Sequence, residues 1–106
     1  MNGNNDKLFG LLTVCRRAGR MVSGFDSCKE SMEKGKAYLI ILASDISPKT
    51  EKEVRFFGSK YNVTVIKTAV TRGGFASGLG KEAAVWSVCD EGFAKRAAEL
   101  ADNLLT

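Results

Sequence analysis

Few side chains in this sequence have the types and spacing that catalysis requires. The chain has no histidine, which excludes a Ser-His-Asp triad, a Cys-His nucleophile and a histidine-ligated metal. Its three cysteines, Cys15, Cys28 and Cys89, have an odd count and no CxxC spacing. Neither a zinc site nor a disulfide framework is therefore predicted, and each cysteine is interpreted as a small buried hydrophobic residue. We expect no metal and no cofactor.

The glycine-rich stretch 73–82 resembles a phosphate-binding loop but does not match one. The motif GxxxxGK[ST] needs a glycine at position 75 and a hydroxyl at position 82, where the chain has Phe75 and Glu82. Without that hydroxyl the magnesium ligand is missing, and no GxGxxG motif is present. We interpret these glycines as residues that permit tight turns and a close approach of the backbone to a partner.

Asp45 is the acidic residue best placed for chemistry. It follows a predicted buried strand, where α/β sheets bind their ligands. General acid–base catalysis needs a second placed group, and no second carboxylate is evident beside Asp45. A small enzyme centred on Asp45 is therefore the least favoured interpretation. The commoner role is a loop aspartate that caps the next turn, and we predict that the protein is not an enzyme.

Positive charge is concentrated in the first three quarters of the chain. Residues 1–81 carry 14 Lys and Arg against 7 Asp and Glu, whereas residues 82–106 carry two basic and five acidic residues. Such an asymmetry favours a polyanionic partner such as nucleic acid, on a face built by residues 1–81. An ordinary solvated surface is the alternative interpretation.

Three segments are expected to converge at one end of a sheet. Residues 23–27 would place the backbone N–H groups of a helix start, which suit phosphate or base edges. Residues 44–47 form a loop, and residues 68–77 are glycine-rich and include Arg72. Four basic residues lie close to the first segment in sequence: Arg20, Lys29, Lys34 and Lys36. This arrangement is suited to folded RNA, whereas stacking of single strands is not supported because no strand is rich in aromatic residues.

The elements that must position these segments alternate between helix and strand. Apolar residues at helical spacing, such as Leu8, Leu11, Leu12 and Cys15, predict an amphipathic first helix. Ser23 with Asp26 is close to a capping box, and Ser47 before Pro48 marks a second helix start. Continuous apolar or β-branched runs predict strands at 21–22, 38–43, 63–66 and 83–88.

This alternation predicts an α/β fold, a three-layer α-β-α sandwich with a small mixed sheet of about four strands. We expect one domain over residues 1–106, with residues 1–5 as a flexible tail. The longest apolar run is 38–43, too short to cross a membrane, and the polar N-terminus lacks the layout of a signal peptide. A cytoplasmic protein without membrane contact is predicted.

Segments spread over nearly the whole chain resemble one known family. Taken in order, residues 18–24, 34–37, 39–48, 61–65 and 80–83 are similar to the kink-turn RNA-binding ribosomal proteins of the L7Ae and L30e type, and most of all to their small bacterial members. The resemblance runs from about residue 8 to residue 104. It implies an α-β-α sandwich and a non-catalytic protein that binds RNA.

The family signature is Gly-x-Asn-Glu at the start of the second helix, followed by a lysine, and it recognises the tandem sheared G·A pairs of a kink-turn. The matching residues here are Gly24, Phe25, Asp26 and Ser27. Glu30 stands where the lysine is expected, with Lys29 one position before it. An aspartate accepts hydrogen bonds but cannot donate them, unlike an asparagine. Ala76 and Ser77 also depart from the usual Leu-Gly pair.

The sequence therefore predicts a ribosomal or ribosome-associated protein that binds structured RNA, with a kink-turn as the candidate target. Ribosomal or other proteins are expected as further partners of a monomer. The alternative is an adaptor of the same fold that has lost RNA recognition and docks a partner through its acidic C-terminal helix, residues 90–106. The residues predicted to contact RNA are Arg20, Gly24, Phe25, Asp26, Ser27, Lys29, Lys36, Asp45 and Arg72.

Overall fold

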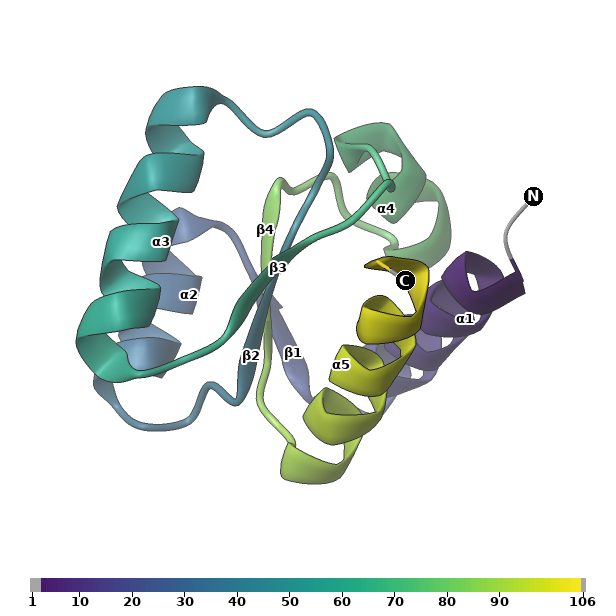
Figure 1. The fold of residues 1–106 in the computed structure, drawn as a ribbon, viewed down its shortest axis with the longest axis horizontal. Helices are drawn as coiled ribbons and strands as arrows, with labels where there is room; N and C mark the ends of the chain where they lie inside the picture. Colours follow the sequence, from purple (N-terminus) through teal and green to yellow (C-terminus); the bar gives the residue numbers. More distant parts are fainter. Residues whose placement is uncertain (1–2, 106) are drawn as a thin grey trace.

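Helices and strands alternate along the chain in a computed structural model that describes residues 3–105, with the side chains of residues 6–101 (Figure 1). The elements in order are α1 (Gly3–Arg17), β1 (Met21–Ser23), α2 (Phe25–Glu33), β2 (Leu39–Leu42), α3 (Pro48–Tyr61), β3 (Val65–Lys67), α4 (Arg72–Leu79), β4 (Val85–Val88) and α5 (Glu91–Leu105). The strands form one sheet in the order β1-β4-β2-β3. Strand β4 is antiparallel to both β1 and β2, while β2 and β3 are parallel, so the sheet is mixed.

The sheet lies between two layers of helices, which confirms the predicted sandwich. Helices α2 and α3 cover one face, and α1, α4 and α5 cover the other (Figure 1). Strand β2 shows why its sequence is continuously apolar: Leu39 and Ile41 belong to the core under α1, α4 and α5, whereas Ile40 and Leu42 belong to the core under α2 and α3. All four are buried.

Helix α3 begins where the sequence predicts a helix start. The hydroxyl of Ser47 accepts a hydrogen bond from the backbone N–H of Thr50 at 3.2 Å, and Pro48 is the first helical residue. Asn62 ends the helix in the left-handed conformation with φ 57°. Such a backbone is more accessible to asparagine than to most side chains, which explains the turn into β3.

Other boundaries differ from the prediction. Helix α1 begins at Gly3, inside the stretch 1–5 that the sequence predicts as a flexible tail, and residues 1–2 lie outside the described residues. Strand β2 excludes Tyr38 and Ala43 from the predicted run, and the side chain of Tyr38 is exposed. The side chain of Phe25, at the start of α2, is half-buried.

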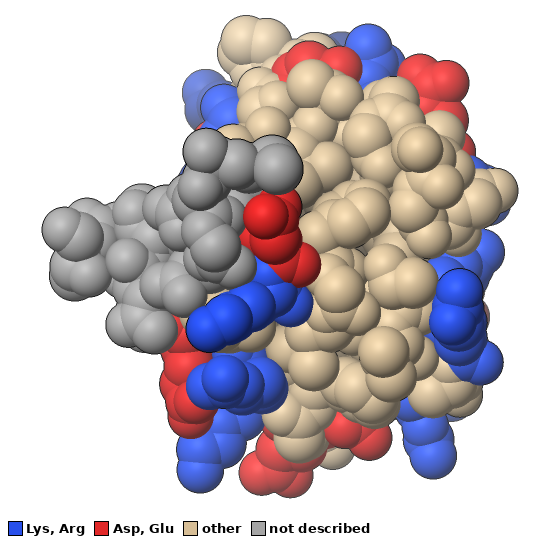
Figure 2. Space-filling view, turned by 90° about the vertical axis from the view of Figure 1, so that its right-hand side faces the viewer, with Lys and Arg blue, Asp and Glu red and all other residues tan. Residues whose placement is uncertain are grey.

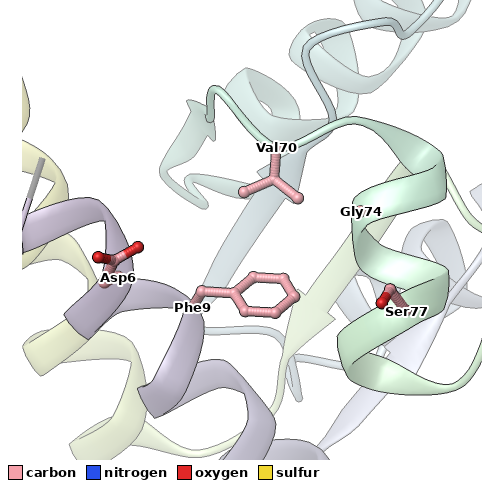
Figure 3. Close-up of a pocket in the computed structure, with 5 residues that line it drawn as sticks. All are labelled: Asp6, Phe9, Val70, Gly74 and Ser77. Carbon is pink, nitrogen blue, oxygen red and sulfur yellow. The ribbon is translucent and has the colours of Figure 1, made fainter. Parts of the chain in front are cut away.

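Helix α4 is short and glycine-rich, and one side chain anchors it. Phe75 is fully buried, and its ring centroid lies 6.2 Å from that of Phe9 on α1 and 6.0 Å from that of Trp86 on β4. Gly78 permits the contact with α1, because a Cβ there would lie 2.1 Å from the Phe9 ring. A hollow of about 320 Å³ remains between α1 and α4, and Phe9 points into it toward α4 (Figure 3).

Arg16 at the end of α1 connects three elements. Its guanidinium group donates hydrogen bonds to the carbonyl oxygens of Leu79, at 3.4 Å, and Met21, at 3.5 Å. The same group lies over the indole of Trp86, 5.3 Å from the ring centroid. Arg16 therefore holds the end of α1 to α4 and to strands β1 and β4.

Candidate nucleic-acid interface

Three helices begin at the same edge of the sheet. Strands β1, β2 and β3 end at this edge, and β4 begins there. The last residue of β1, Ser23, is paired with Trp86 of β4. The last residue of β2, Leu42, is paired with Val85 at the start of β4 and with Lys67 at the end of β3. Helices α2, α3 and α4 each follow one of the three ending strands (Figure 1). We call this surface, made by residues 23–27, 43–48, 68–72 and 80–84, the helix-start edge.

Backbone hydrogen bonds join the loops of the helix-start edge. The N–H of Gly24 donates to the carbonyl of Val85 at 3.0 Å, and the N–H of Ser44 donates to the carbonyl of Val70 at 2.8 Å. The N–H of Ala43 donates to the carbonyl of Ala84 at 2.9 Å. The predicted convergence of residues 23–27, 44–47 and the start of 68–77 is therefore confirmed as geometry.

Helix α2 begins without a side-chain cap. Its N-cap residue is Gly24, with φ 89° and ψ 155°, a backbone conformation that is essentially restricted to glycine. Ser23, predicted to cap this helix with Asp26, is instead the last residue of β1, so the capping box does not form. The first N–H groups of a helix have no acceptor within it. With no cap on α2, those of residues 25–27 are available to a ligand.

The side chains of the first turns of α2 divide into two groups. Asp26 and Ser27 are exposed at the helix-start edge. Phe25 and Lys29 instead lie against α3, where the Phe25 ring centroid is 6.1 Å from that of Phe57 and the Lys29 Nζ is 4.7 Å from the same Phe57 centroid. The structure therefore places Lys29 beside the helix-start edge, toward α3.

Asp45 and Arg72 are brought together across 27 residues of sequence. The Oδ1 atom of Asp45 accepts a hydrogen bond from the backbone N–H of Arg72 at 2.9 Å, and Oδ2 pairs with the Arg72 Nε at 3.5 Å. Asp45 thus binds the start of α4, where Thr71 also caps through its hydroxyl. The prediction that Asp45 caps the turn that follows it is wrong, because its hydrogen bond goes to the more distant helix.

Asp45 should make the stability of the protein depend on pH. The hydrogen bond from the Arg72 backbone N–H, with a smaller contribution from the guanidinium, holds the pKa of Asp45 below its ordinary value of 3.8. Stability from this carboxylate is therefore present above the unfolded pKa and is lost as pH falls through the lower folded pKa. We expect Asp45→Asn to lower the urea midpoint at about pH 6, and this difference to shrink as the pH falls below 3.8, the ordinary pKa of the carboxyl. A difference that is constant across this range would contradict the assignment.

Arg20 and Lys36 lie at the opposite edge of the sheet. The carbonyl of Arg20 accepts a hydrogen bond from the N–H of Cys89, just after β4, and the backbone N–H of Lys36 donates to Ser31 before β2 begins. Strands β1 and β2 run from these residues to the helix-start edge. Arg20 and Lys36 are therefore close to residues 23–27 in sequence but lie at the other end of the strands. The two basic residues therefore lie outside the helix-start edge.

The cysteines supply no reactive thiolate at the helix-start edge. Cys15 and Cys28 are buried, as predicted, whereas Cys89 is half-buried. Burial raises the pKa of the Cys15 thiol to about 11 and that of Cys28 to about 12, so both stay protonated near neutral pH. Within the described part of the chain, no three His, Cys, Asp or Glu residues are grouped so that they could hold a metal ion.

Comparison with known proteins agrees with this architecture. The model of the "Ribosomal protein L7Ae/L30e/S12e/Gadd45 family" matches residues 6–98, which include the whole helix-start edge. The chain belongs to this family. Its L7Ae-type fold is thus established over most of the sequence. No helix among the described residues is long and apolar enough to span a membrane.

Two bacterial relatives match the L7Ae-type chain over almost their whole length. Both are named RNA-binding protein YlxQ: one from Enterococcus faecium is 29% identical over 101 residues, 95% of this chain and 97% of the relative. The other, from Bacillus subtilis strain 168, is 35% identical over 95 residues, 89% of this chain and 94% of the relative.

Solved structures of other L7Ae-type proteins confirm the fold. A protein of unknown function from Bacillus halodurans superimposes with a TM-score of 0.86 at 29% identity, over 91% of this chain and 97% of that one. The 15.5 kD RNA-binding protein of Giardia lamblia superimposes with a TM-score of 0.78 over 99% of this chain and 90% of that one. At 14% identity, the second similarity establishes the fold alone.

Proposed function

We propose that this protein is a non-catalytic RNA-binding protein that binds structured RNA through the helix-start edge. The observation that carries the proposal is the uncapped start of α2 beside the Asp45–Arg72 pair on one edge of an L7Ae-type fold. Support comes also from the two YlxQ relatives, which are named as RNA-binding proteins. In this proposal the carboxylate of Asp45 has a structural role as the partner of Arg72, and that of Asp26 has a role in recognition. Neither is proposed to be catalytic.

Three kinds of contact are available at this edge. The unpaired N–H groups of residues 25–27 can donate to phosphate oxygens or to base acceptors, with the helix dipole favouring negative charge. The Arg72 guanidinium, half-exposed beside Asp45, can neutralise phosphate. Asp26 is exposed and accepts hydrogen bonds only, so it selects base edges that donate, such as amino groups.

A kink-turn in ribosomal RNA is the proposed target. The positions of Gly24, Phe25, Asp26 and Ser27 at the start of α2 match those of the family signature. With Asp26 in place of asparagine, we propose that the protein selects a kink-turn that presents donors at this position. We also propose that the protein is a cytoplasmic monomer and that it binds this RNA at the ribosome.

The proposal is tested by fluorescence anisotropy with a labelled kink-turn RNA and a plain hairpin of equal length, at low and physiological salt. We expect tighter binding of the kink-turn, and affinity for both RNAs that falls steeply with salt, because phosphate contacts release counterions. Equal affinity for the two RNAs would overturn the kink-turn target. Absence of binding to either would overturn RNA binding itself and favour a protein-interaction adaptor.

A matched pair of arginine variants locates the binding surface. Arg72 pairs with Asp45 at the helix-start edge, whereas Arg96 pairs with Glu99 on α5, and the two side chains have similar exposures of 50% and 57%. We expect Arg72→Ala to weaken binding and to reduce the salt slope by about one, as for the loss of one phosphate contact. Arg96→Ala should leave both unchanged, and equal effects of the two variants would contradict this placement.

A further inference from the structure

Four aromatic side chains of α2 and α3 form one cluster. Phe57 is at the centre, with ring centroids 6.1 Å from Phe25, 5.2 Å from Phe56 and 6.4 Å from Tyr61. The Phe56 ring meets Phe57 edge-on, while Tyr61 is stacked on it. We call Phe25, Phe56, Phe57 and Tyr61 the aromatic face. Helices α2 and α3, which carry it, lie side by side on one side of the sheet (Figure 1).

Core packing explains only part of the aromatic face. Phe57 and Tyr61 pack against the buried core under α2 and α3. Phe56 does not belong to that core, and 62% of its side chain is exposed, more than Val14 at 54% or Tyr38 at 48%. A phenylalanine left in water forgoes the free energy of burial, so this ring is better suited to a contact outside the fold.

Lysines accompany the rings. The Nζ of Lys29 lies 4.7 Å from the Phe57 centroid, and the Nζ of Lys60 lies 5.4 Å from the Tyr61 centroid. Neither lysine forms an ion pair within residues 6–101. By contrast, Arg55, which is on α3 like Lys60, is paired with Glu51. An acidic side chain also contacts the aromatic face, since the Tyr61 hydroxyl donates a hydrogen bond to Glu33 at 3.5 Å. An exposed ring beside half-buried ones, with cations that form no ion pair within residues 6–101, is a combination suited to unpaired nucleotides, which bind by stacking and phosphate contact.

The aromatic face is continuous with the helix-start edge. Phe25 is the first residue of α2 and contacts Phe57, so the rings begin where the proposed contact with structured RNA ends. A strand that leaves the structured element would pass the start of α2 before it reaches Phe57 and Phe56. The surface over α1 and α4 has a broad uncharged area, with both basic and acidic residues at its margins (Figure 2).

We propose that unpaired nucleotides flanking the bound RNA structure stack on Phe56 and its neighbours, with Lys29 and Lys60 contacting their phosphates. This inference rests on the proposed RNA binding at the helix-start edge and names the second part of the ligand. The sequence did not support single-strand stacking, because no strand is rich in aromatic residues. The proposed stacking surface is formed by two helices instead.

The test measures the affinity of the wild type and of Phe56→Ala for two forms of one kink-turn RNA. One form has blunt ends, and the other carries a single-stranded extension of about six nucleotides, placed at one end or at the other. We expect the extension at one end to tighten wild-type binding by roughly 5- to 150-fold, the range of one stacked base. In Phe56→Ala this gain should be lost while affinity for the blunt RNA is unchanged. Tyr38→Ala, which removes another exposed ring at the opposite edge, should keep the full gain.

Each outcome separates this inference from the function on which it rests. If the wild type binds neither RNA, RNA binding itself fails, and the aromatic face has no role in it. If the blunt RNA binds and the extension adds nothing, or if the gain survives in Phe56→Ala, the aromatic face does not contact RNA and serves another partner. Photocrosslinking of 5-iodouridine in the extension should label Phe56 or Tyr61, and labelling confined to other elements would also overturn the inference.

Discussion

Replacing Phe75 with alanine is expected to lower the free energy of unfolding by about 3–5 kcal/mol, as for other fully buried phenylalanines. Phe75 is the anchor of a helix of eight residues, and its ring contacts both Phe9 and Trp86. The loss would be a large fraction of the roughly 5–15 kcal/mol that stabilises a domain of this size. Urea denaturation followed by far-ultraviolet circular dichroism measures it.

Phe56→Ala is the matched control for Phe75→Ala. It removes the same atoms from a side chain that is 62% exposed, so we expect a change within about 0.5 kcal/mol. A similar loss of stability in the two variants would show that α4 is not held by Phe75 as described. The control also establishes that the Phe56 variant is folded when its RNA binding is measured.

Gly24→Ala is expected to reduce RNA affinity on the order of tenfold, about 1.4 kcal/mol. The backbone of Gly24, with φ 89° and ψ 155°, aims the first N–H groups of α2 out of the helix-start edge. Alanine in this conformation is strained by roughly 1–3 kcal/mol, and relief of that strain would turn the helix start away from its ligand. A binding titration, with thermal denaturation in parallel, measures the two effects.

A second glycine distinguishes a binding defect from a folding defect. Gly35 also has a positive φ, 69°, with open space where a Cβ would lie, and it follows α2 at the opposite edge. Gly35→Ala should cost roughly 1–2 kcal/mol of stability without changing affinity for RNA. If the two variants bind RNA equally well, the start of α2 is not a contact surface.

The sequence predicted the fold where local chemistry decides the structure. Ser47 with Pro48 starts α3 because a hydroxyl cap and a proline act within one turn. The apolar run before Ala43 becomes a central strand because helices cover both of its faces. Asp90 likewise caps α5 within one turn, and its carboxylate accepts a hydrogen bond from the N–H of Phe93 at 2.9 Å.

The sequence failed where pairing between distant residues decides the structure. Ser23 looked like a helix cap, but its pairing with Trp86 draws it into β1 and leaves Gly24 as the N-cap. Arg20 looked close to the α2 start, but β1 carries the chain across the sheet between them. The aromatic face was missed because it combines one ring of α2 with three of α3, and only Phe57 and Tyr61 share a helical spacing.

Pairing of the first strand with the last has a consequence for how the chain folds during its synthesis. Strand β1 is hydrogen-bonded to β4, and the cores of α1 and α5 are one cluster, so the first quarter of the chain is completed by the last. Such distant pairings form late and slow the folding of a domain. While residues 85–101 are still inside the ribosome, β1 has no neighbouring strand and the apolar side of α1 has no cover. The domain should therefore fold after its synthesis, in a single cooperative step.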